Sequence, residues 1–195
     1  MKKLLREIQG CRVCEAQLSH GPRPVLTASP ESKIVIIGQA PGIKVHQSGI
    51  PWDDASGKRL RNWLGIEGDL LYDTRHFAII PMGFCYPGKG SSGDLPPRKE
   101  CAPQWHADLW EQLTSVKLTL LIGTYAQKYY LGKRYKGTLT ETVRHYTEYL
   151  PQFFPLVHPS PLNHRWLKRN PWFAAEVLPV LRSNVQQYLS ESDNT

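Results

Sequence analysis

The chain has 195 residues, of which 41% are hydrophobic and 21% charged, a balance typical of a globular domain and unlike that of a disordered chain. No stretch approaches the ~20 apolar residues of a membrane span, and the N-terminus has no apolar signal core, so we expect one cytoplasmic domain over residues 1–195. The net charge of +7 favours a polyanionic partner, because each neutralised phosphate releases counterions.

Cysteine spacing is the first informative feature along the chain. Cys11 and Cys14 are separated by two residues, and the chain has only two further cysteines, Cys85 and Cys101. Structural disulfides are rare in a cytoplasmic protein, so the four thiols indicate a metal site. Zinc and an iron–sulfur cluster both accept four thiolates, and the spacing does not choose between them. The alternative is two free buried thiols beside a coincidental pair.

Four continuous apolar runs are predicted to be buried parallel strands, because helices on both faces of a sheet remove the usual alternation. They lie at 33–38, 77–84, 117–123 and 153–158. Helical patterns lie at 56–65, 102–115, 124–131 and 138–150, and a last helix is predicted with Asn170 as its N-cap and Leu189 near its end. Alternating strands and helices predict a three-layer α/β/α sandwich with a central, mainly parallel four-stranded sheet.

Two polar loops directly follow predicted strands. One reads Gly-Gln-Ala-Pro-Gly at 38–42, and the other reads His-Pro-Ser-Pro at 158–161. Ligands of open α/β sheets bind outside the carboxyl ends of the strands, so these loops are predicted to form two walls of one active site. The long polar connections at 43–55 and 86–100 are also typical of functional loops.

These loops, with Gly-Ile-Pro-Trp at 49–52, Gly57 and the ordered cysteines, resemble the uracil-DNA glycosylase superfamily, and most closely its iron–sulfur (family 4) branch. The resemblance implies a monofunctional DNA glycosylase that hydrolyses the N-glycosidic bond of uracil or a related damaged base in base excision repair. It also implies a structural 4Fe–4S cluster, with zinc as the second choice. The cluster ligands would be Cys11, Cys14, Cys85 and Cys101. The expected partner is DNA, single- or double-stranded, with a flipped base, and we expect a monomer.

The same resemblance assigns roles to residues of the two loops. His158 is expected to donate a hydrogen bond to the base carbonyl while negative charge grows on the departing base. The alternative for His158 is a loop histidine that caps the next helix. The backbone amides of Gln39 and Ala40 are expected to contact the base edge, and Trp52 is expected to stack on the base unless it belongs to the core.

Contacts with the DNA backbone are expected after the second loop. Leu162 lies where the superfamily carries a wedge that holds a base out of the stack. Ser160, Arg165 and Lys168 are expected to contact DNA phosphates. The alternative for the basic residues is a solvated helix face.

Two residues depart from the family pattern. Gln39 stands where the family usually has glutamate, and glutamine cannot act as a general base although it can orient a water. Pro81 stands where the family usually has an asparagine that reads uracil, and proline offers neither a side-chain donor nor a backbone N–H. The excised base is therefore left open, and Asp53 or Asp54 is a candidate replacement base, with helix capping the favoured role.

The alternative function is a non-catalytic DNA-binding protein that keeps the glycosylase fold and the iron–sulfur cluster. Gln39 and Pro81 favour it, whereas the retained His158 loop disfavours it. A doubly wound small-molecule enzyme is a third class, but the chain has neither glycine-rich phosphate-binding motif of that class.

Overall fold

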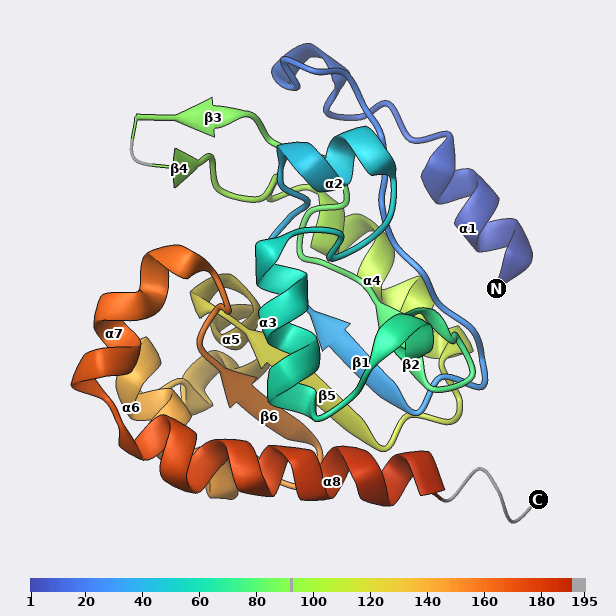
Figure 1. Ribbon diagram of the computed structural model, residues 1–195. Coiled ribbons are helices and arrows are strands. Elements are labelled where there is room, and N and C mark those ends of the chain that lie inside the picture. The colour runs from blue at the N-terminus through green and yellow to red at the C-terminus, as the bar shows by residue number, and fades with distance from the viewer. Residues whose placement is uncertain (92, 191–195) are drawn as a thin grey trace.

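A four-stranded parallel sheet forms the centre of the computed structural model, which describes residues 1–91 and 93–190 (Figure 1). The strand order is β2-β1-β5-β6, and every neighbouring pair is parallel. The strands are β1 (Ile34–Ile37), β2 (Phe77–Ile79), β5 (Leu118–Ile122) and β6 (Phe153–Leu156). The predicted sandwich with a parallel four-stranded sheet is thus confirmed.

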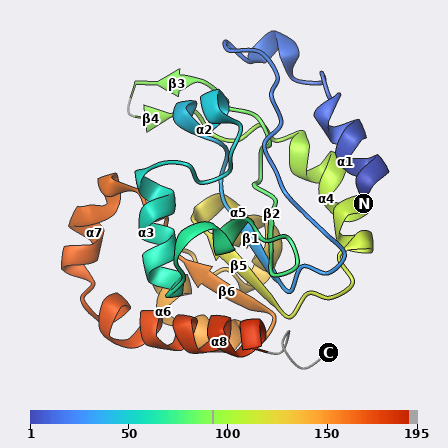
Figure 2. The same ribbon diagram turned by 45° about the vertical axis from the view of Figure 1, so that its right-hand side comes forward.

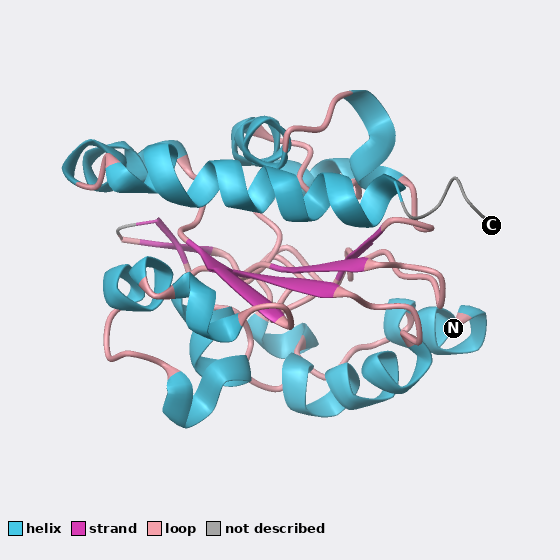
Figure 3. Ribbon diagram, turned by 90° about the horizontal axis from the view of Figure 1, so that it is seen from below, coloured by secondary structure: helices cyan, strands magenta, loops and turns pink. Residues whose placement is uncertain are grey.

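Successive residues of each strand point into different cores. Ile34 and Ile36 pack into one apolar cluster, whereas Val35 and Ile37 pack into the other. Helices cover both faces of the sheet, which lies between two helical layers (Figure 3). Both faces of every strand are therefore buried, and this explains why the strands read as continuous apolar runs.

The helices divide between the two faces. One layer holds α3 (Ala55–Leu64), α6 (Leu139–Arg144) and α8 (Leu178–Ser190). The other holds α1 (Lys2–Gln9), α4 (Cys101–Gln112) and α5 (Thr124–Leu131), with α1 beside α4 in both views (Figures 1 and 2). No helix among the described residues is long and apolar enough to cross a membrane.

Three short elements surround the carboxyl end of the sheet. They are α2 (Ile43–Ser48), the hairpin of β3 (Lys89–Gly90) and β4 (Gly93–Asp94), and α7 (His164–Arg169). Figures 1 and 2 both show α2 beside the β3–β4 hairpin. The connections predicted at 43–55 and 86–100 therefore contain a helix and a hairpin.

Three predicted elements differ from the structure. Strand β2 ends at Ile79 rather than at residue 84, because Pro81 has no N–H for a ladder. The last helix does not begin with an Asn170 cap: the Asn170 side-chain oxygen accepts from the Trp172 indole, and a π-helical turn, Phe173–Val177, precedes α8. The segment 138–150 is α6 followed by a separate 3-10 turn, Tyr146–Tyr149. Further 3-10 turns are Glu15–Gln17, Gly68–Tyr72, Gly132–Arg134 and Pro161–Asn163.

A buried amide joins the carboxyl ends of two strands. Gln127 is fully buried on α5, and its Nε2 donates to the carbonyls of Leu121 at 3.2 Å and Leu156 at 2.9 Å. These carbonyls belong to β5 and β6, and β6 leads directly to His158. Gln127 therefore fixes the strand end from which the second loop departs.

Replacing Gln127 by leucine should lower the free energy of unfolding by about 1–2 kcal/mol, because two buried hydrogen bonds are lost. Chemical denaturation of wild type and variant measures the change. The matched control is Gln104→Leu on exposed α4 surface, expected within about 0.5 kcal/mol of wild type. A Gln127→Leu protein as stable as wild type would contradict the bridging role.

Candidate active site

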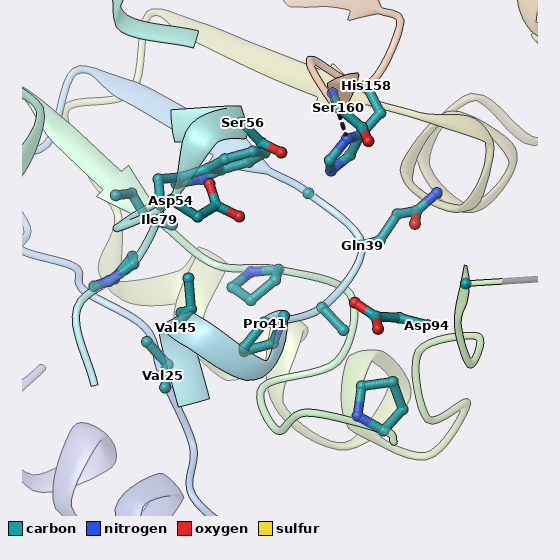
Figure 4. A pocket seen from close by; sticks show the side chains of 18 of the residues that line it. Val25, Gln39, Pro41, Val45, Asp54, Ser56, Ile79, Asp94, His158 and Ser160 are labelled. Carbon is teal, nitrogen blue, oxygen red and sulfur yellow. Dashed lines mark hydrogen bonds between the residues drawn. The ribbon is translucent and has the colours of Figure 1, made fainter. Parts of the chain in front are cut away.

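A cavity of about 350 Å³ lies at the carboxyl end of the sheet (Figure 4). Both predicted loops line it, the first through residues 38–42 and the second through His158 and Ser160. The β3–β4 hairpin and the start of α3 supply the remaining polar walls, through Asp94, Asp54 and Ser56. The structure thus brings together two segments that are more than a hundred residues apart in the sequence.

The first loop is held by the chain that follows β2. The backbone amides of Met82 and Gly83 donate to the carbonyls of Gly38 at 3.0 Å and Gln39 at 2.9 Å. The described residues give the backbone amides of Gln39 and Ala40 no hydrogen-bond partner, and both residues line the cavity. Two backbone donors are therefore available at this wall, and their contact with a base edge stays a prediction.

His158 is held in one tautomer. The backbone N–H of Ser160 donates to His158 Nδ1 at 3.1 Å, so the ring proton of the neutral imidazole belongs on Nε2. The opposite edge of the ring points into the cavity (Figure 4). Burial lowers the pKa of His158 to about 4, and the nearby Asp54 carboxylate offsets this only in part. His158 therefore presents a neutral N–H donor to the cavity.

The turn that carries His158 is itself braced. Asn163 Nδ2 donates to the His158 carbonyl at 2.8 Å, and Arg59 Nη1 donates to the Ser160 carbonyl at 3.0 Å. The Ser160 hydroxyl accepts from the Leu162 amide at 3.2 Å and caps the 3-10 turn that follows. The Ser160 side chain thus has a structural partner within its own loop, and it also lines the cavity.

Trp52 lies beside His158 rather than deep in the core. The two ring centroids are 5.5 Å apart at 32°, and Trp52 is partly buried and lines the cavity. Its φ of +56° lies in the left-handed region, where a bulky side chain is a genuine outlier. The Trp52 carbonyl lies where a Cβ on Gly57 would be, so only glycine fits at position 57. The glycine that the resemblance singles out at position 57 is therefore required by the tight turn that positions Trp52.

Two carboxylates line the cavity. Asp54 caps α3 by accepting the Gly57 amide at 2.8 Å, which agrees with the capping role favoured from the sequence. Asp94 lies on the hairpin, where its Oδ1 accepts from the Tyr86 hydroxyl at 3.3 Å. The sequence analysis did not identify Asp94 as a site residue. The only feature of the sequence that could have indicated it is its position in the long polar connection 86–100. Asp53 does not line the cavity.

The residues predicted to contact DNA occupy an exposed rim. Leu162 is 82% exposed although it lines the cavity mouth, as expected of a wedge. Arg165 and Lys168 are exposed on α7 outside the cavity. The sequence has another basic cluster at 58–61, for which the two interpretations are DNA binding and a solvated helix face. In the structure its Arg59 and Arg61 are engaged internally, Arg61 with the Tyr72 hydroxyl at 3.2 Å. These two arginines therefore brace the fold, which neither of the two interpretations of that cluster anticipated.

A buried chain of hydrogen bonds supports Pro81, which lines the cavity. His106 Nε2 is 3.1 Å from the Pro81 carbonyl, and its Nδ1 is 2.6 Å from the Tyr130 hydroxyl. A carbonyl only accepts, so His106 carries its proton on Nε2 and Tyr130 donates to Nδ1. The Trp110 indole in turn donates to the Tyr130 oxygen at 2.9 Å. Every member is satisfied, so the backbone at Pro81 is firmly fixed.

The four cysteines come from three segments: residues 11–14, the chain after β2, and the start of α4. All are free of disulfides, and Cys101 begins α4. Burial, with a smaller contribution from Cys11 and Cys14, raises the pKa of Cys85 to about 11. Among the described side chains, no group of three or more His, Cys, Asp or Glu is spaced to hold a metal ion. The donor set is suited to a cluster, but it is not gathered into a cage.

Comparison with known families places the chain in a described superfamily. A model described as the uracil DNA glycosylase superfamily matches residues 26–182. This range includes both loops of the cavity, the hairpin and two of the cysteines, Cys85 and Cys101. It begins after Cys11 and Cys14, so the match does not extend to the first cysteine pair.

The His106 network makes folding stability depend on pH. Burial lowers the pKa of His106 to about 4, whereas an unfolded chain has the ordinary value of 6.5. Between these pH values the unfolded state binds the extra proton, so stability should be complete above pH 6.5 and fall as the pH drops toward 4. His106→Phe should reduce this slope by up to about 1.4 kcal/mol per pH unit, measured by denaturation at several pH values.

The matched control is Leu109→Ala on the same buried face of α4. It should lower stability at every pH and leave the slope of wild type unchanged, because it removes no titrating group. A His106→Phe protein with the wild-type slope would contradict the buried neutral state of His106.

Proposed function

Since the chain belongs to the uracil DNA glycosylase superfamily, we propose that it is a monofunctional DNA glycosylase that hydrolyses the N-glycosidic bond of uracil or a related damaged base. The observation that carries the proposal is the neutral His158, which has its proton fixed on Nε2 and faces the same cavity as the Gln39 and Ala40 amides. No lysine lines that cavity among the described residues, so a Schiff-base lyase step has no candidate nucleophile there.

The cavity is suited to stabilising a departing base. As the bond to deoxyribose breaks, negative charge grows on the base and positive charge on the sugar. His158 Nε2–H donates to the base carbonyl without transferring its proton, and the amides of Gln39 and Ala40 donate to the base edge. Trp52 offers an aromatic face at the same wall. These donors are fixed before the reaction, so little reorganisation is needed when charge develops.

Asp94 is our candidate for activating the attacking water. One oxygen of each carboxylate already has a partner, the Gly57 amide for Asp54 and the Tyr86 hydroxyl for Asp94, but only Asp54 also caps a helix and acts through its charge on His158. Asp94 has a carboxylate in the same cavity, and Gln39 lines it and orients the water. A carboxylate at this place also faces the positive charge that grows on the sugar. Asp94 thereby supplies the charge that glutamine at position 39 lacks.

DNA binding is proposed to follow the rim. Leu162 would occupy the gap left by the flipped base, and Arg165 and Lys168 would contact phosphates beside it. Pro81 closes one wall of the cavity without a side-chain hydrogen bond, so discrimination among bases is expected to be weak. The non-catalytic DNA-binding alternative is favoured by this same wall and by Gln39, and the assay below separates the two functions.

We also propose that Cys11, Cys14, Cys85 and Cys101 hold a 4Fe–4S cluster, as in the family 4 branch that the chain resembles. The chemistry of four unpaired cysteines supports this, whereas their present spacing does not form a cage. A bound cluster would connect the N-terminal arm to the start of α4, beside the hairpin that carries Asp94. Its role would be structural, and no step of the reaction passes through it.

A single-turnover assay on oligonucleotides that carry uracil, hypoxanthine, xanthine or oxidised pyrimidines tests the main proposal. Wild type should produce alkali-labile sites with at least one base, and His158→Ala should slow the reaction by roughly 100-fold or more, because one oxyanion donor is lost. DNA binding without product from any base would overturn the proposal in favour of the non-catalytic binder.

In the same assay, Asp94→Asn and Asp54→Asn form a matched pair that keeps the shape of each side chain. Asp94→Asn should reduce the single-turnover rate by roughly 100-fold or more, because the water loses its base. Asparagine is also a good helix cap, so the Asp54→Asn variant should fold normally, and its single-turnover rate should fall by less than that of Asp94→Asn. Equal rates for Asp94→Asn and wild type would remove Asp94 from the mechanism.

Iron and zinc analysis of protein purified without oxygen tests the cluster. Wild type should carry about four iron atoms and visible absorption, whereas Cys101→Ser should lose both together with thermal stability. Zinc at one atom per chain with no visible colour would overturn the cluster and support the second choice.

A further inference from the structure

A second cavity, of about 760 Å³, adjoins the candidate active site. It lies between α5, the chain after β4 and the start of α4. Pro87 and Leu95 line both cavities, so the two hollows share one wall. A ligand that occupies the first cavity and extends past Leu95 therefore reaches the second.

Exposed aromatic rings characterise the second cavity. Tyr125 and Tyr129 lie four residues apart on α5, which places them on the same face of the helix. Their exposed fractions are 41% and 47%, high for tyrosines that line a cavity. Pro96 and Pro97 line it from the loop after β4. Flat aromatic faces of this kind stack nucleobases without regard to sequence, because every base has a π-face.

The charge of the lining is positive. Arg98, Lys99 and Lys128 line the second cavity, and no Asp or Glu does so among the described residues. Arg98 is paired with Glu100 at 2.6 Å and Lys128 lies 5.6 Å from the Tyr135 ring centroid, whereas Lys99 is exposed. An anionic ligand with aromatic groups fits this lining better than a neutral one.

We propose that the second cavity binds an unstacked nucleotide that neighbours the flipped one, so that this protein prefers single-stranded DNA. The inference rests on the proposed function, because it places the target base in the first cavity. In a duplex the neighbouring base is paired and stacked, and removing it costs a few kcal/mol, whereas in a single strand this cost is small. Tyr125 and Tyr129 stack the base, and Lys99 neutralises an adjoining phosphate.

Fluorescence anisotropy with labelled oligothymidylate free of damaged bases tests the proposal, against a duplex of the same length. The Tyr125→Ala/Tyr129→Ala double variant should bind the single strand 10- to 100-fold more weakly and bind the duplex as wild type does. The matched Tyr125→Phe/Tyr129→Phe variant keeps both rings and should retain single-strand binding. Both tyrosines are a little under half exposed and Tyr129 also contacts Tyr130, so circular dichroism checks that each variant is folded.

Three results would overturn the inference. They are unchanged single-strand binding by the alanine variant, an equal loss for single strand and duplex, and binding of a proline-rich peptide at this cavity that oligothymidylate does not displace. Because the probe carries no damaged base, this test does not depend on catalysis. If no base is released but single-strand binding depends on the tyrosines, only the glycosylase proposal is contradicted. If a base is released but binding does not depend on the tyrosines, only the proposed second binding site is contradicted.

Discussion

The hydrogen bond from the Ser160 backbone amide to Nδ1 of His158 determines the chemistry open to the candidate site. It leaves the ring proton on Nε2, where the neutral ring acts as a donor toward the cavity. Asn163 and Arg59 hold the same turn through its carbonyls, so the His158 loop is braced both from within and from α3. A neutral donor that is fixed in advance stabilises an anion in the transition state more than it stabilises a neutral ground state.

The sheet order explains how the two loops meet although β1 and β6 are not neighbours. Strand β5 lies between them, and it is followed directly by Gly123, whose φ is +85°. A Cβ at Gly123 would lie 3.2 Å from Nε2 of Gln39, so the absence of a side chain leaves room for the first loop. Gln127 ties β5 to β6 just below this point. The cavity therefore depends on the missing side chain at Gly123 as well as on the residues of the two loops.

The sequence predicted the sheet, its helical layers and the meeting of the two loops, because apolar periodicity and strand-end chemistry are local signals. It did not predict Asp94, since a lone aspartate in a polar connection has no periodic pattern and its place depends on the β3–β4 turn. Arg59 was counted with a basic cluster, whereas its bond to the Ser160 carbonyl spans 101 residues and leaves no local trace. The prediction of Asn170 as a helix cap was wrong, because the side-chain oxygen of Asn170 accepts from the neighbouring Trp172 indole instead.

Pro81, in the wall of the first cavity, bears on how both cavities would select a substrate. Its carbonyl accepts a hydrogen bond from His106, and its ring offers no hydrogen bond. A cavity with few base-specific contacts cannot reject normal bases strongly by direct recognition. If the proposed function holds, selection comes from how easily a base leaves its stack, which favours bases in single strands or in unstable pairs. An aromatic site for the neighbouring base amplifies that same difference, so the apolar wall at Pro81 and the exposed tyrosines of α5 are consistent with one mode of substrate choice.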